Sequence, residues 1–192
     1  THVVYGEDMG ILAGDALLNY AFETAVSAFS IEGVDAVNIG QALQVLAKKA
    51  GIYGMIGGQV VDVKCTGQSI SGDTLDFIYR LKTGALIESS MMIGAILAGA
   101  SKEEIEIVET IAQKVGLAFQ IQDDILDVTS TAEVLGKPIH SDEKNEKTTY
   151  VTWKGIEAAK AEVKQLSEEA VKELKRLEST DEYLELLLES LI

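Results

Sequence analysis

Pro138 is the only proline among 192 residues, so the chain can form long helices without the residue that breaks them most strongly. Nearly half of the residues are apolar and few are aromatic. This composition suits packed helices better than a fold of many short strands and turns. We therefore predict an all-α protein.

Apolar residues recur at spacings of three and four along most of the chain, which is the pattern of helices that pack on one face. Ser101 and Glu104 form a capping box that marks the start of one helix. No repeat or linker divides the chain, so we expect a single domain over residues 1–192. The predicted helices span residues 7–30, 36–50, 52–64, 72–99, 101–128 and 153–177, with a short last helix after Asp181.

The charge balance and the cysteine content exclude several classes of protein. The formal net charge is −15, whereas proteins that bind nucleic acid need clustered Lys and Arg, so we expect no nucleic-acid partner. Cys65 is the only cysteine, which fits a reducing, cytoplasmic location. The most apolar stretch, residues 84–100, contains Glu88 and is shorter than the ~20 residues of a membrane span, so we expect none.

Three aspartates lie close together in the predicted helix 101–128. Successive helical residues are rotated by about 100°, which places Gln120, Asp123, Asp124 and Asp127 on one arc about 100° wide. Apolar side chains flank this arc on both sides, as at residues 119, 121, 125 and 126. An acidic stripe between apolar flanks is more typical of a cavity wall than of an open surface.

These aspartates, the carboxylate box, favour a divalent cation. Closely spaced carboxylates repel one another unless cations bind between them. Carboxylate oxygens suit Mg²⁺, which keeps several waters and is usually completed by substrate phosphates. The box therefore predicts Mg²⁺ and diphosphate binding. A solvated acidic helix face would have the same spacing, so the box alone leaves both interpretations open.

The box belongs to a longer motif at residues 116–127, Gly-Leu-Ala-Phe-Gln-Ile-Gln-Asp-Asp-Ile-Leu-Asp. This motif resembles the second aspartate-rich motif of the trans-prenyl diphosphate synthases, of the farnesyl and geranylgeranyl type. The resemblance covers nearly the whole chain and implies the isoprenoid synthase fold, a helical bundle around a central substrate cavity. Further family motifs occur in order: Gly-Glu-Asp-Met-Gly-Ile-Leu-Ala-Gly-Asp-Ala-Leu-Leu at 6–18, Gly-Gly-Gln-Val-Val-Asp at 57–62, Lys-Thr-Gly-Ala-Leu at 82–86, Leu-Gly-Lys at 135–137 and Lys-Thr-Thr-Tyr at 147–150.

The resemblance also implies roles for particular residues. Mg²⁺ would be held by the box, with Asp123 as the direct ligand and the other two aspartates acting partly through water; Asp142 matches a further acidic residue near the metal. Three lysines would contact the allylic diphosphate, although alone each could be a solvated surface charge. The implied metal residues are Asp123, Asp124 and Asp127; the implied catalytic residues are Lys82, Thr83 and Lys137; and the implied substrate-binding residues are Lys82, Thr83, Gln120, Lys137, Lys147 and Asp62.

The implied activity is prenyl transfer for short-chain isoprenoid biosynthesis. An allylic diphosphate would be ionised with Mg²⁺, condensed with isopentenyl diphosphate and deprotonated. The resemblance also implies a homodimer. It does not give the length of the product, because in this family that length is set largely beside a first aspartate-rich motif that the chain lacks.

The missing first motif makes us expect that the chain starts within a longer protein, as its C-terminal two-thirds, and that this fragment is inactive in prenyl transfer. Robust product from Mg²⁺, isopentenyl diphosphate and an allylic primer would contradict that expectation. Two alternatives remain: a non-catalytic scaffold or regulatory subunit of a heteromeric synthase, and a helical bundle with a structural acidic face. A terpene cyclase shares the ionisation chemistry, but the Lys-Thr-Gly and Gly-Lys elements fit chain elongation better. Mg²⁺-dependent binding of pyrophosphate would separate the two alternatives from an enzyme site.

Overall fold

The computed structural model describes residues 1–131, 133, 136, 147–177 and 182–190. These residues form helices and turns and contain no β-strand, which confirms the predicted all-α class. None of the described helices combines the length and apolar character needed to cross a membrane. The longer helices are α2 (Glu7–Val26), α3 (Ala36–Ala50), α4 (Met55–Cys65), α5 (Gly72–Tyr79), α6 (Ala85–Leu97), α7 (Lys102–Thr129), α11 (Ile156–Leu174) and α12 (Glu182–Glu189); the short ones are α1 (His2–Tyr5), η1 (Ser27–Ser30), η2 (Arg80–Gly84) and α10 (Tyr150–Lys154).

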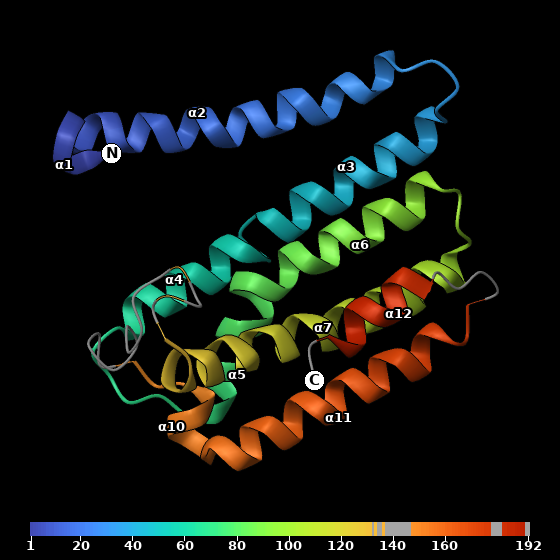
Figure 1. Ribbon diagram of the computed structural model, residues 1–192. Helices are drawn as coiled ribbons and strands as arrows, with labels where there is room; N and C mark the ends of the chain where they lie inside the picture. Colours follow the sequence, from blue (N-terminus) through green and yellow to red (C-terminus); the bar gives the residue numbers. More distant parts are fainter. Residues whose placement is uncertain (132, 134–135, 137–146, 178–181, 191–192) are drawn as a thin grey trace.

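Four long helices lie side by side in the order α3, α6, α7 and α11, each packed on the next (Figure 1). Helix α7 is central to the core because its apolar side chains enter two clusters. One cluster joins α7 to α5, α10 and α11, and the other joins it to α11 and α12. With Ile121 and Ile125 buried in the first cluster, the remaining face of α7 is available for polar side chains.

The start of α7 agrees with the prediction. Ser101 Oγ accepts a hydrogen bond from the backbone N–H of Glu104 (3.2 Å), and Glu104 Oε2 accepts one from the backbone N–H of Ser101 (2.7 Å). This is the predicted capping box, which satisfies two backbone donors at the helix start.

The predicted helix over residues 72–99 is interrupted, so the prediction of one continuous helix is wrong. Its first part, α5, passes into a π-helical turn, η2, before α6 begins. A π-turn bonds each residue to the fifth one before it and inserts an extra residue into the helix, often at a functional site. Gly58 of α4 lies against this turn so closely that an added Cβ would be 2.3 Å from the Lys82 backbone nitrogen.

Two other predicted boundaries are wrong. The helix expected over 153–177 instead starts as α10, breaks at Gly155 where φ is 87°, and continues as α11. Residues other than glycine rarely adopt that φ, so the break is located at Gly155. The helix expected from residue 52 begins at Met55, after a turn.

Helix α2 differs most from its prediction, since we expected it to be packed. None of its residues is buried, and large apolar side chains such as those of Ile11, Leu17 and Tyr20 are exposed. In Figure 1 it lies apart from the other long helices, and its main contacts are with α1 and η1.

A partly buried ion cluster joins α3, α6 and α7. Lys49 Nζ lies 2.8 Å from Glu109 Oε1 and also contacts Glu88, which is only 7% exposed. Burial alone would lower the pKa of Lys49, but the hydrogen bonds and charges of the two glutamates outweigh it and raise that pKa above its usual value. This cluster links three neighbouring helices of the bundle.

Candidate functional site

A cavity of about 150 Å³ opens among α4, α5, η2, α7 and the segment 147–149 that precedes α10. Six of the predicted site residues line it: Asp62, Lys82, Gln120, Asp123, Asp124 and Lys147. They come from four separate stretches of sequence. The fold therefore brings most of the predicted residues to one place.

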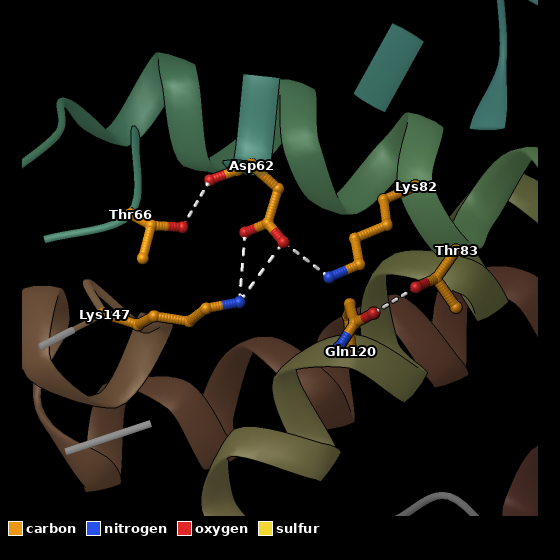
Figure 2. A network of polar contacts seen from close by, with 6 residues as sticks. All are labelled: Asp62, Thr66, Lys82, Thr83, Gln120 and Lys147. Atoms are coloured by element: carbon orange, nitrogen blue, oxygen red, sulfur yellow. Dashed lines mark hydrogen bonds and ion pairs between the residues drawn. The ribbon is translucent and has the colours of Figure 1, made fainter. Parts of the chain in front are cut away.

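Asp62 of α4 is the centre of the polar contacts in this cavity (Figure 2). Its Oδ2 atom lies 2.6 Å from Lys82 Nζ and 3.2 Å from Lys147 Nζ, and its Oδ1 atom lies 3.3 Å from Lys147 Nζ. Burial alone would raise the pKa of Asp62, but hydrogen bonds and charges from the two lysines outweigh it and lower that pKa. The carboxylate is therefore held in its charged form.

Local contacts hold Lys147 at the cavity. The next residue, Thr148, accepts a hydrogen bond of 3.4 Å on its Oγ1 atom from the backbone N–H of Ile70. Thr149 caps α10 by accepting from the backbone N–H of Thr152. Lys147 thus extends from a segment that is bonded both to the loop before α5 and to the start of α10.

Thr83 and Gln120 form a second pair, between η2 and α7. The Thr83 hydroxyl donates a hydrogen bond to Oε1 of Gln120 (Figure 2). Gln120 lines the cavity, whereas Thr83 is not among the residues that line it. The π-turn thus directs Lys82 to Asp62 and Thr83 to Gln120.

Asp124 has two partners that the sequence did not identify. Its Oδ2 atom accepts a hydrogen bond from the hydroxyl of Tyr79 (2.6 Å) and another from the backbone N–H of Tyr150 (2.8 Å). All three residues are buried. Asp124 therefore fastens α5 and α10 to α7; Tyr79, one helical turn before Lys82, carried no recognisable motif.

The remaining predicted residues do not join this group. Asp127 is buried on α7 and is not among the residues that line the cavity. Lys137 and Asp142 lie outside the described residues. Within the described ranges, no three His, Cys, Asp or Glu side chains converge as a group that could hold a metal ion without other ligands.

The sequence matches the family model described as "Polyprenyl synthetase" over residues 1–187. The chain belongs to the polyprenyl synthetase family. It is 46% identical over 179 residues to a chloroplastic geranylgeranyl pyrophosphate synthase of Capsicum annuum, covering 93% of this chain and 48% of that protein. It is 42% identical over 172 residues to large subunit 1 of a chloroplastic heterodimeric geranylgeranyl pyrophosphate synthase of Arabidopsis thaliana, covering 88% of this chain and 46% of that protein.

The fold also matches known structures. A geranyltransferase from Helicobacter pylori, solved as a complex with magnesium and isoprenyl diphosphate, superposes with a TM-score of 0.80 at 32% identity, covering 99% of this chain and 61% of that one. The fold is that of the isoprenoid synthases, as predicted. The chain spans about half the length of the curated relatives it matches.

Proposed function

We propose that this chain forms one wall of a prenyl transfer site that binds the diphosphate of an allylic substrate together with Mg²⁺. The observation that carries the proposal is the convergence of Lys82 and Lys147, which are 65 positions apart by their residue numbers, on the cavity that Asp123 lines. The whole protein would then elongate the allylic diphosphate with isopentenyl diphosphate.

The chemistry of such a transfer suits the side chains of the cavity. When an allylic C–O bond ionises, negative charge develops on the diphosphate that leaves. Ammonium groups held in fixed positions stabilise that charge without having to reorganise. Lys82 and Lys147 are 34% and 29% exposed at their side chains, so a ligand in the cavity can reach both. Gln120, held by the hydroxyl of Thr83, would line the path of the allylic chain.

The donors present fit Mg²⁺. This ion binds proteins through one or two carboxylates and completes its shell with water and substrate phosphates, so it requires no cage made by protein alone. Asp123 would bind it directly, and Asp124 and Asp127 would act through water. Bound Mg²⁺ would neutralise charge on the departing diphosphate.

Calorimetric titration with pyrophosphate tests the proposal. We expect binding in the presence of Mg²⁺ and its loss in Asp123→Ala. Asp15→Ala, on the exposed face of α2, is the control and should bind as the parent chain does. Absence of Mg²⁺-dependent binding in the parent chain, or equal binding by Asp123→Ala, would contradict the proposal.

A non-catalytic scaffold or regulatory role in a heteromeric synthase is the second candidate. One similar protein is named as a subunit of a heterodimeric synthase, and α2 exposes large apolar side chains over its whole length. The same titration separates the two candidates, because a scaffold has no need to bind Mg²⁺ with pyrophosphate.

Two further expectations remain proposals. The exposed apolar side chains of α2 support the homodimer, and sedimentation of the chain at micromolar concentration should then give twice the monomer mass. The lone Cys65 supports a reducing compartment such as the cytoplasm. Fractionation of the source cells would test the location.

A further inference from the structure

Asp62 occupies the position between two ammonium groups that an anionic ligand would use. Its carboxylate contacts Lys82 Nζ and Lys147 Nζ at once, through a shared Oδ2 atom (Figure 2). The side chain of Asp62 is 15% exposed, less than either lysine. Among the described residues that line the cavity, the two lysines are thus already paired with an anion that belongs to the protein.

The charge of the cavity does not favour a bare anion. Among its described lining residues, the formally charged side chains at neutral pH are Lys82, Lys147, Asp62, Asp123 and Asp124, which leaves a net charge of −1. A pyrophosphate ion without metal must therefore displace Asp62 from the lysines and approach two further carboxylates. Mg²⁺ brought in with the ligand supplies the missing positive charge.

We infer that Asp62 is an internal counter-ion that makes diphosphate binding depend on Mg²⁺, by keeping Lys82 and Lys147 paired until a metal-bound ligand replaces it. This inference rests on the proposed function. It assigns Asp62 the role of a residue that selects the metal complex of the ligand over the free anion. The position of Asp62 on α4, facing lysines from η2 and from the segment before α10, places it between the two cations rather than beside one of them.

Replacing Asp62 with a neutral residue should release both lysines. A neutral amide oxygen binds an ammonium group less strongly than a carboxylate does. We expect Asp62→Asn to bind pyrophosphate in EDTA at least about tenfold more tightly than the parent chain does, because one negative charge beside the ligand is removed. Asp62→Ala, which also removes the acceptor atom, should show the same gain.

Two controls separate release of the lysines from other effects. Asp73→Asn removes one negative charge from the exposed first turn of α5, outside the cavity lining, and should leave binding in EDTA unchanged. The double variant Asp62→Asn/Lys82→Met should lose the gain of Asp62→Asn. Thermal unfolding followed by circular dichroism confirms that each variant is folded.

The calorimetry distinguishes failure of the inference from failure of the proposed function. If the parent chain binds pyrophosphate with Mg²⁺ but neither Asp62 variant gains binding in EDTA, the inference is wrong and the proposed function stands. A gain of equal size in Asp73→Asn also overturns it. If the parent chain binds no pyrophosphate with Mg²⁺ and the Asp62 variants bind none without it, both the inference and the proposed function are wrong.

Discussion

The hydroxyl of Tyr79 lies 2.6 Å from Oδ2 of Asp124, and this hydrogen bond joins α5 to α7 within the protein interior. The same oxygen accepts the backbone N–H of Tyr150, so one carboxylate orients the helix that precedes Lys82 and the helix that follows Lys147. Asp124 thereby holds in place the helices that lie next to Lys82 and Lys147 in the sequence. In the hydrogen bonds described above it contacts neither lysine.

Tyr79→Phe removes this bond while it preserves the ring. We expect a loss of about 1–3 kcal/mol in the free energy of unfolding, because a buried carboxylate loses one of its donors. Urea denaturation measures the loss. The control is Tyr53→Phe. Tyr53 is 77% exposed, so loss of its hydroxyl should cost less than about 0.5 kcal/mol. Equal losses would contradict a special role for Tyr79.

Lys49→Met should destabilise the bundle because it leaves Glu88 and Glu109 without their shared cation. Removing one partner of a buried ion cluster typically costs about 3–5 kcal/mol, and we expect about 2–4 here because Glu109 is partly exposed. Lys48→Met, one residue earlier on an exposed face of α3, is the matched control and should change stability by less than about 0.5 kcal/mol. Denaturant unfolding at neutral pH compares the two, and similar losses would refute the importance of the cluster.

Gly58→Ala should disturb the π-turn. The added methyl would be 2.3 Å from the backbone nitrogen of Lys82, so η2 or α4 must move. We expect a loss of more than about 2 kcal/mol in stability, the size typical of overpacking and backbone shifts. Gly94→Ala on α6 provides the opposite result: nothing lies within 4 Å of its added Cβ, and alanine should stabilise the helix by about 0.5–1 kcal/mol. Changes in melting temperature of opposite sign for the two variants would confirm both expectations.

The lowered pKa of Asp62 makes the contribution of this residue to the free energy of unfolding depend on pH. Because the folded-state pKa lies below the ordinary value of 3.8, the contribution of Asp62 to stability is complete above 3.8 and is lost as the pH falls through the lowered pKa. The difference in unfolding free energy between the parent chain and Asp62→Asn should therefore be constant from pH 7 to about pH 5 and shrink below 3.8. Urea titrations at several pH values measure it. A difference that grows as the pH falls would have the wrong sign.

Sequence patterns predicted the parts of the fold that depend on near neighbours. The capping box of Ser101 and Glu104 lies within a single turn, and the side-chain spacing of α7 follows from helical geometry, so both are visible in the sequence. The π-turn was not, because its residues are compatible with an ordinary helix and its close packing against Gly58 of α4 depends on the fold. The exposure of α2 was also missed, because the apolar spacing of a helix does not show whether another element covers it.

The candidate site was likewise predictable from the sequence only in part. Motifs identified Asp62, Lys82 and Lys147 individually, but their contact joins residues up to 85 positions apart and required the fold. Similarly, the helical arc places Asp127 with the other aspartates of the box, but only the fold shows that Asp127 is buried and is not among the residues that line the cavity.

The π-turn at Arg80–Gly84 makes the exact number of residues in this stretch part of its design. Deleting one residue would remove the extra position and allow regular α-helical bonding, so α6 could keep its orientation while the turn itself lost its shape. Lys82 and Thr83 lie within this turn, and without it they could no longer both reach their partners on α4 and α7. Between Tyr79 and Ala85, the chain should therefore tolerate substitutions far better than a change of length.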